Sequence, residues 1–239
     1  ATLQPLKRAE VKSVAVSLLF SFLHPQHEQR VREILAEEMP GVEVSLSSEV
    51  VPQIREYYRL STTVINAYLE PILARYIANL ESRLEAARVK TPQKYIMQSN
   101  GGMSTFAATA KKAVATVLSG PAGGINASVQ ACRTTGFNNL ITFDMGGTSC
   151  DVALIKDGEP SVSHRGKIDG RDIALPMIDI NTVSAGGGTL ARVDRFGALE
   201  VGPRLVIRAT AGVAPTAAAN ELTLTLKPGE SATLGYSFR

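Results

Sequence analysis

The segment from residue 140 to residue 155 constrains the fold most, because two apolar, strand-like runs flank a turn that is rich in polar groups. The turn and its ends carry two carboxylates, two glycines and two hydroxyls, namely Asp144, Asp151, Gly146, Gly147, Thr148 and Ser149. Glycines let the backbone approach a phosphate closely and direct successive N–H groups at it. A phosphate-binding β-hairpin is therefore favoured over an ordinary tight hairpin between buried strands, which is the alternative.

Each polar residue of this hairpin has an expected role. Asp144 ends a buried run directly before the glycines, so it is the candidate catalytic residue and Mg²⁺ ligand. Thr148 should reach a phosphate through its hydroxyl or its N–H. Asp151 begins the return strand, where it would either contact the ligand or cap the turn. Cys150 has no basic partner nearby in the sequence, which argues against a catalytic thiol. The predicted cofactor contacts of the hairpin are Gly146, Gly147, Thr148, Ser149 and Asp151.

Further glycine pairs follow apolar stretches, so several glycine loops could converge on one cleft. Within residues 119–124, Gly120 and Gly123 would either bind an anion at a helix start or allow close helix packing. A later run would either contact a nucleotide or only allow a tight turn, and it consists of Gly186, Gly187 and Gly188. All five glycines are predicted cofactor contacts.

Hydrophobic periodicity predicts alternating strands and helices in the first third of the chain. A strand over residues 11–22, a helix over 25–38 and a strand over 42–46 suggest a parallel βαβ unit. The longest helical stretch covers residues 54–89, and Pro71 should kink it or divide it in two.

Shorter elements are predicted after the long helix. Helical patterns cover residues 105–112 and 125–135, strands are expected over 94–98, near 160–164 and over 178–183, and a small hairpin over 190–201. A further strand is possible over 221–226. The whole pattern is typical of a mixed α/β fold.

Composition excludes several classes of partner. The net charge is only +3 and no dense Lys/Arg block occurs, so no nucleic-acid partner is expected. The longest apolar run, residues 14–22, is interrupted by serines and far too short for a membrane span. Two cysteines suggest no disulfide framework and favour a reducing, cytoplasmic location. The chain also lacks a P-loop and a nucleophile elbow.

Six motifs resemble the hydantoinase/oxoprolinase family, specifically its A-type subunit. They occupy residues 19–28, 47–57, 97–102, 118–124, 143–151 and 182–189, and the fifth reads Phe143-Asp-Met-Gly-Gly-Thr-Ser-Cys-Asp151. The resemblance runs through most of residues 11–203, and the six motifs together are highly specific.

The resemblance implies a partial actin-like ATPase fold, of the ribonuclease-H-like α/β type, with mixed sheets and flanking helices. Residues 1–118 would form the C-terminal part of the first lobe. Residues 119–203 would begin the second lobe with its phosphate-binding hairpin, and 204–239 would be a divergent tail. The family's first phosphate loop would lie upstream of Ala1, so we expect a fragment of a longer protein.

The resemblance also implies a function. ATP and Mg²⁺ would drive the opening of a cyclic amide, such as a hydantoin or 5-oxoproline, by phosphorylating the amide oxygen. One alternative is the ATP-binding subunit of an acetone or acetophenone carboxylase. Another is a nucleotide-gated binding or chaperone-like module. The implied partners are a small cyclic amide or ketone, a B-type hydantoinase subunit and further copies in an oligomer.

Overall fold

The computed structural model describes residues 3–168, 170–193, 196–197 and 199–202 of the chain. The chain forms two compact units. The first comprises Ala1–Thr142 and Ala153–Ile180, and the second comprises Phe143–Val152 and Asn181–Arg239. The predicted tail, with its possible strand over 221–226, lies outside the described residues.

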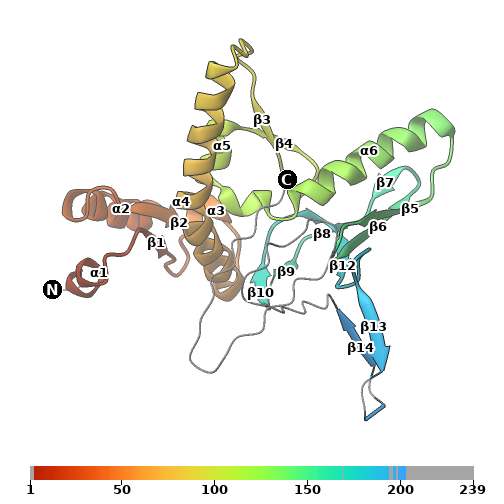
Figure 1. Ribbon diagram of the computed structural model, residues 1–239. Helices are drawn as coiled ribbons and strands as arrows, with labels where there is room; N and C mark the ends of the chain where they lie inside the picture. The colour runs from red at the N-terminus through yellow and green to blue at the C-terminus, as the bar shows by residue number, and fades with distance from the viewer. Residues whose placement is uncertain (1–2, 169, 194–195, 198, 203–239) are drawn as a thin grey trace, which may run out of the picture. The chain divides into compact units, whose positions relative to one another are not determined.

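A parallel βαβ unit opens the first compact unit, as the sequence predicts (Figure 1). Strands β1 and β2 pair in parallel, with Ser13 opposite Glu43. Apolar side chains from both strands and from the intervening helix form the core of this part, namely Val16, Leu35, Met39 and Leu46. The elements are α1 (Gln4–Arg8), β1 (Ser13–Val16), α2 (Gln26–Glu38) and β2 (Glu43–Leu46).

Strand β1 ends at Val16, so the predicted strand over 11–22 is wrong beyond that residue. The chain turns instead at Phe20, whose φ is +56° and whose carbonyl accepts hydrogen bonds from the amides of Leu23 and His24. The apolar, β-branched composition of this segment predicted a strand that is too long. A buried polar network fixes the turn that follows β1.

Glu28 is the carboxylate of that network and is completely buried. It accepts hydrogen bonds from the amides of Leu18 and Ser48, each at 2.9 Å, and from the Ser47 hydroxyl at 2.6 Å. Burial by itself would raise the pKa of Glu28, but these hydrogen bonds outweigh it and lower the pKa from its ordinary value.

Arg59 is the cation of the same network, and its side chain is also fully buried. It donates to the Ser47 hydroxyl at 3.0 Å, to the Gln53 carbonyl at 2.9 Å and to the Leu18 carbonyl at 2.6 Å. Its guanidinium also lies 5.4 Å from the ring centre of Phe22. The Leu18 amide therefore donates to Glu28, and the Leu18 carbonyl accepts from Arg59.

The lowered pKa of Glu28 predicts an acid-dependent stability. Its contribution is fully present above the unfolded pKa of about 4.5 and is lost as the pH falls through the lower folded pKa. Glu28→Gln should therefore cost roughly 3 kcal/mol at pH 7, and the difference from wild type should narrow below about pH 4.5. Denaturant unfolding at several pH values measures this difference.

Glu38→Gln is the matched control, because Glu38 also has a pKa lowered by its partner Lys7 but lies at the surface. Solvent screens such a pair, so its loss should leave the unfolding free energy almost unchanged at every pH. A pH-independent difference between wild type and Glu28→Gln would contradict the proposed role of ionised Glu28.

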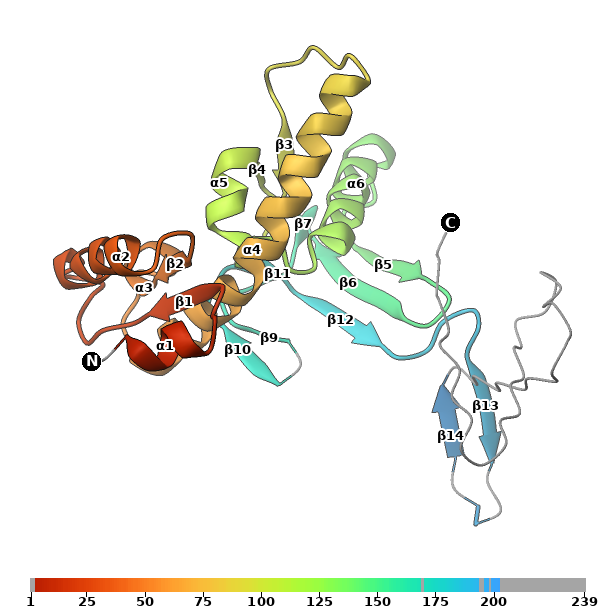
Figure 2. The same cartoon turned by 60° about the vertical axis from the view of Figure 1, so that its left-hand side comes forward.

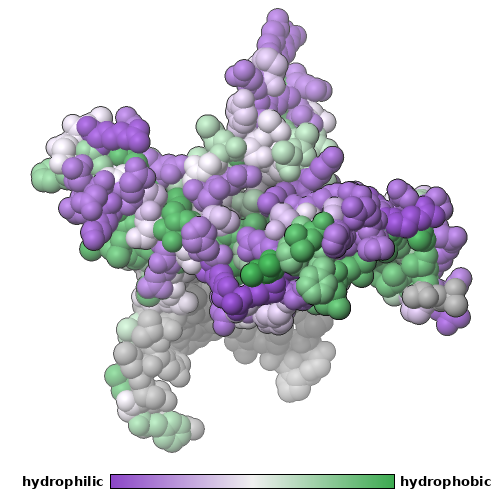
Figure 3. All heavy atoms as spheres, turned by 180° about the vertical axis from the view of Figure 1, so that it is seen from behind, coloured by the Kyte–Doolittle hydropathy of each residue, from purple (hydrophilic) through white to green (hydrophobic). Residues whose placement is uncertain are grey.

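The long helix α4 (Glu56–Ala86) follows α3 (Ser47–Val50) and is continuous, so Pro71 does not divide it. Its buried residues are mostly polar, namely Arg59, Thr62, Thr63, Asn66, Ala67, Glu70 and Ile77. Several apolar residues on it are instead exposed, including Leu60, Val64, Tyr68, Ile72 and Tyr76. In Figure 3 the C-terminal end of α4 stands at the top and is mostly hydrophilic.

The elements after α4 include a hairpin that the sequence analysis did not predict. Strands β3 and β4 pair antiparallel, and Gly101 in their turn has a φ of +81°, a conformation that favours glycine. Helix α6 begins at Ser119, so the predicted helix start at residue 125 is wrong. The elements are β3 (Tyr95–Met97), β4 (Met103–Thr105), α5 (Phe106–Lys111), η1 (Ala113–Thr116) and α6 (Ser119–Thr135).

A mixed set of strands completes the described part of the chain, with a sheet in the order β12-β6-β5 and β7 paired with β6. The predicted strand over 178–183 is divided between β11 and β12 (Figure 2). The predicted small hairpin is confirmed as β13 and β14, which pair antiparallel. No helix within the described ranges is long and apolar enough to cross a membrane.

The strands of this set are β5 (Leu140–Met145), β6 (Cys150–Lys156), β7 (Glu159–Pro160), β8 (Val162–Ser163), β9 (Gly166–Ile168), β10 (Arg171–Ile173), β11 (Met177–Ile178), β12 (Ile180–Val183), β13 (Leu190–Val193) and β14 (Leu199–Gly202). Two further apolar clusters pack the first unit. One includes Val51, Val114 and Ile173, and the other includes Ala122 and Ile155.

Candidate functional site

Four residues, 146–149, join the neighbouring strands β5 and β6 and so form the turn of a β-hairpin, as predicted. The Gly146 amide donates to the Ser149 carbonyl at 2.9 Å and closes the turn. Asp144, Gly147 and Thr148 are all exposed. Within the described ranges, the amides of Gly147 and Thr148 make no hydrogen bond. The turn therefore offers free N–H donors beside a carboxylate.

A second glycine loop, residues 186–189, packs directly on this turn. The Gly187 amide donates to the Gly146 carbonyl at 2.9 Å, and the Gly188 amide donates to the Gly147 carbonyl at 2.8 Å. We call residues 146–149 and 186–189 together the paired glycine loops. Their contact is made backbone to backbone, so it fixes the carbonyls of the turn and uses neither the Gly147 amide nor the Thr148 amide as a donor.

The close approach of the two loops explains why glycine is needed at Gly186. A Cβ atom there would lie 2.6 Å from both the Gly146 oxygen and the Thr148 nitrogen, which is impossible without a backbone shift. A Cβ at Gly187 would be 3.8 Å from its nearest neighbour and would fit. The structure thus gives Gly186 a packing role, while nucleotide contact by Gly187 stays a prediction.

Two threonines outside the predicted set of site residues support the paired glycine loops. The Thr189 hydroxyl accepts a hydrogen bond from the Gly186 amide at 2.6 Å. The Thr182 hydroxyl donates to Asp151 at 2.6 Å. Asp151 receives no hydrogen bond from a turn amide among the described residues, so the structure gives no support to the predicted cap. A hydroxyl directly after the glycine run is the signal that could have identified Thr189, whereas Thr182 lies four residues before Gly186 and is revealed only by its contact with Asp151.

Cys150 directly follows this turn and is buried, with 3% of the residue exposed. Burial raises the pKa of Cys150, and the nearby carboxylates of Asp151 and Asp144 raise it further. A protonated, buried thiol is a poor nucleophile. The structure therefore agrees with the sequence in arguing against a catalytic cysteine.

Gly120 and Gly123 belong to the other compact unit, so their convergence with the paired glycine loops stays a prediction. Gly120 lies exposed in the first turn of α6. Gly123 lies one turn later, where a Cβ would come 3.9 Å from the Met97 side chain, an ordinary contact. Of these two glycines, Gly120 alone therefore occupies the end of a helix where free amides attract an anion.

The donor set fits Mg²⁺ bound together with phosphates. Within the described part of the chain, no group of three or more His, Cys, Asp or Glu residues could enclose a metal ion. Mg²⁺ commonly uses one or two carboxylates and completes its shell with water and phosphate oxygens. Asp144 is the exposed carboxylate that could serve in this way.

Known proteins match the chain across nearly its whole length. A family described as hydantoinase/oxoprolinase matches residues 59–225, and one described as hydantoinase/oxoprolinase N-terminal region matches residues 1–39. Caprolactamase subunit alpha from Pseudomonas jessenii is 39% identical over 246 residues, covering 100% of this chain and 35% of that protein. The 5-oxoprolinase 1 of Arabidopsis thaliana is 40% identical over 195 residues, covering 81% of this chain and 15% of its own length.

Two solved structures have a similar fold. The ATP-dependent caprolactamase from Pseudomonas jessenii has a TM-score of 0.71 and 40% identity, covering 87% of this chain and 29% of that one. Nucleotide-free acetone carboxylase has a TM-score of 0.72 and 29% identity, covering 83% of this chain and 28% of that one. The partial α/β fold predicted from the sequence is therefore confirmed. The chain spans 35% of the sequence of caprolactamase subunit alpha and 29% of the solved caprolactamase chain.

Proposed function

The chain belongs to the hydantoinase/oxoprolinase family, and on that premise we propose that it forms part of an ATP-dependent enzyme that opens cyclic amide rings. The names of its relatives support this reaction, since caprolactam and 5-oxoproline are both cyclic amides. The observation that carries the proposal is the pair of facing glycine loops, whose turn has free amides beside an exposed carboxylate.

In the proposed site, the chain positions phosphates and a metal ion rather than attacking the substrate itself. The amides of Gly147 and Thr148 would donate to phosphate oxygens, and the hydroxyls of Thr148 and Ser149 would add donors. Asp144 would hold Mg²⁺ through its carboxylate. ATP supplies the phosphoryl group that activates the amide oxygen, and Mg²⁺ offsets the phosphate charge.

The second candidate function is ATP-dependent activation of a ketone for carboxylation. It is favoured by one observation, the similarity to acetone carboxylase, whose TM-score of 0.72 equals that of the caprolactamase within 0.01. The paired glycine loops would serve both reactions, because each needs a phosphoryl donor held in place. We further propose a B-type subunit as partner, since the caprolactamase relative is named as subunit alpha. We also propose the cytoplasm as location, in keeping with the two free cysteines, Cys132 and Cys150.

Asp144→Asn tests the proposed metal ligand. The substitution keeps the size of the side chain but removes its charge, so Mg·ATP should bind 10- to 100-fold more weakly. ATP with excess EDTA should bind both proteins alike, because the carboxylate then has no ion to hold. Calorimetric titration measures both affinities.

Asp157→Asn is the control, since Asp157 is an exposed turn residue whose side chain makes no hydrogen bond among the described residues. Its affinity for Mg·ATP should equal that of wild type. Equal affinities in wild type and Asp144→Asn would remove Asp144 from the site.

A separate experiment distinguishes the candidate reactions. Phosphate release from the complete protein is measured with a cyclic amide, or with a ketone plus bicarbonate. If neither substrate stimulates phosphate release, a nucleotide-gated binding module is favoured.

A further inference from the structure

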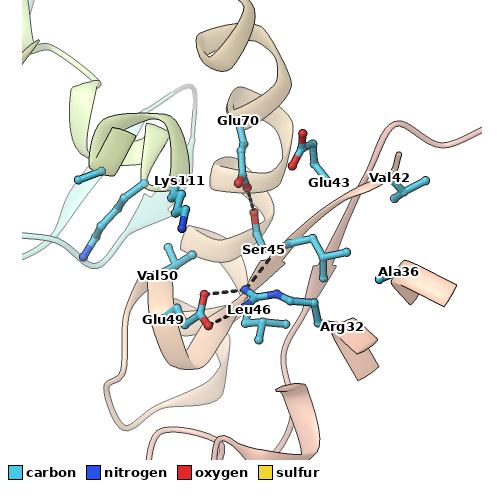
Figure 4. Close-up of a pocket in the computed structure, with 13 residues that line it drawn as sticks. Arg32, Ala36, Val42, Glu43, Ser45, Leu46, Glu49, Val50, Glu70 and Lys111 are labelled. Atoms are coloured by element: carbon cyan, nitrogen blue, oxygen red, sulfur yellow. Dashed lines mark hydrogen bonds and ion pairs between the residues drawn. The ribbon is translucent and has the colours of Figure 1, made fainter. Parts of the chain in front are cut away.

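A cavity of about 640 Å³ lies in the first compact unit, beside β2 and between side chains of α2, α4 and α5 (Figure 4). This volume is within the usual range of small-molecule sites. Six of the thirteen residues that line it are charged. The charged residues are Arg32, Glu43, Glu49, Glu70, Lys111 and Lys112.

Glu70 is the deepest of these groups, with only 9% of its surface exposed. Its Oε2 atom accepts hydrogen bonds from the Ser45 hydroxyl at 2.5 Å and from the side-chain amide nitrogen of Asn66 at 3.3 Å. Its Oε1 atom makes no hydrogen bond among the residues that the structure describes. Burial raises the pKa of Glu70, and the charge of Glu43 adds to that effect, which together outweigh the Ser45 hydrogen bond.

Hydrogen bonds of the Asn66 side chain fix the orientation of the Glu70 carboxyl group. Asn66 donates to Ser45 at 3.0 Å and to the Lys111 carbonyl at 3.2 Å, and it accepts from the Val114 amide at 3.0 Å. These bonds hold Glu70 in one orientation, so that one carboxyl oxygen is used and the other is free. The free Oε1 oxygen is not enclosed by the protein, so it stays open to water or to a ligand in the cavity.

Lys111, which is exposed, and Lys112, which is half-buried, also line the cavity without a charged partner. No ion pair within 4.0 Å joins Lys111 or Lys112 to a carboxylate of the described residues. Burial lowers the pKa of Lys112. Glu43 likewise has no cationic partner within that distance. Arg32 differs, because it pairs with Glu49 through two hydrogen bonds of 2.7 and 2.6 Å.

The cavity thus holds two carboxyl groups and two ammonium groups that do not pair with one another. Glu70 is buried and Lys112 half-buried, whereas Glu43 and Lys111 are exposed. Opposite charges attract, so a ligand that carries both charges could satisfy both sets of groups. We propose that this cavity binds a small zwitterionic amino acid, whose ammonium group contacts Glu70 and Glu43 and whose carboxylate contacts Lys111 and Lys112.

This site does not depend on the proposed function. The ring opening of a cyclic amide yields an amino acid, so the product of that reaction would belong to the same chemical class. Binding can nevertheless be measured without ATP, and it can succeed where ring opening fails, or the reverse. The two proposals are therefore distinguishable.

Calorimetric titration with three probes of equal chain length tests the charge requirement. The probes are 6-aminohexanoate, hexylamine and hexanoate, which carry both charges, only the ammonium and only the carboxylate. We expect 6-aminohexanoate to bind at least tenfold more tightly than either of the others. Equal binding of hexylamine would show a simple cation site, and equal binding of hexanoate a simple anion site. Either result, or no binding of 6-aminohexanoate, would overturn the proposal.

Glu70→Gln locates the binding to the cavity. The variant should lose at least tenfold in affinity for 6-aminohexanoate while its melting temperature stays equal or rises, because a buried charge is removed. Lys111→Met should weaken the same probe and leave hexylamine unaffected. Glu85→Gln, on the exposed end of the same helix, is the control and should bind like wild type. Folded Glu70→Gln with wild-type affinity would place the ligand elsewhere and contradict the site.

Discussion

Replacing Gly186 by alanine is expected to reduce the affinity for Mg·ATP about 100-fold. The new Cβ would lie 2.6 Å from the Gly146 oxygen and the Thr148 nitrogen, and backbone atoms cannot move aside as a side chain can. The second loop would separate from the turn, and the hydrogen bonds from the Gly187 and Gly188 amides would break. Phosphate-binding amides that are displaced by even 1 Å lose most of their effect.

Gly187→Ala is a sharp control because it adds the same methyl group one residue further on. Its Cβ would be 3.8 Å from the Gly146 oxygen, an ordinary contact, so the two loops should stay packed on each other as in wild type. Amide hydrogen exchange provides a readout without nucleotide. The Gly188 amide should lose protection in Gly186→Ala and keep it in Gly187→Ala. Equal nucleotide binding and equal protection in both variants would contradict the paired packing of the loops.

Replacing Arg59 by leucine is expected to destabilise the protein by about 3–5 kcal/mol. The substitution leaves the Gln53 and Leu18 carbonyls without their buried donor and removes the hydrogen bond to Ser47. Glu28 would keep its own hydrogen bonds, but the Ser47 hydroxyl that bonds to it would lose its donor from Arg59. Leucine fills much of the space, so the loss reflects the unpaired polar groups more than a cavity. Denaturant unfolding measures the difference.

Arg75→Leu separates this effect from the general loss of an arginine on α4. Arg75 is exposed and makes no hydrogen bond or ion pair with any residue that the structure describes. Its replacement should change the free energy of unfolding by less than about 0.5 kcal/mol. A loss below 1 kcal/mol in Arg59→Leu would show that the buried network is not required for stability.

Local patterns predicted the elements whose hydrogen bonds are local or whose turns are short. The βαβ unit, the hairpin at residues 146–149 and the small hairpin around Gly197 all follow from runs of apolar residues divided by glycine or proline. Such signals are reliable because a turn residue and its neighbouring strands lie close in the sequence.

The buried face of α4 could not be predicted in this way. The apolar residues Leu60, Val64 and Tyr68 recur with a helical period, yet the structure exposes them and buries Arg59 and Asn66 instead. The partners that satisfy those polar groups come from other parts of the chain, such as Leu18 for Arg59 and Val114 for Asn66. A helical period shows that a face exists, but distant residues decide which face is buried.

The sequence by itself determined the family, the α/β class and the glycine-rich hairpin with Asp144 at its strand end, because these depend on residue types at short, fixed spacing. Only the tertiary structure decided that the loop at Gly186 packs backbone to backbone on that hairpin, and that Glu70 and Lys111 share one cavity. Glu70 and Lys111 lie 41 positions apart in the chain, and Gly186 lies 40 positions after Gly146. Contacts across such separations form through packing, so no local pattern records them.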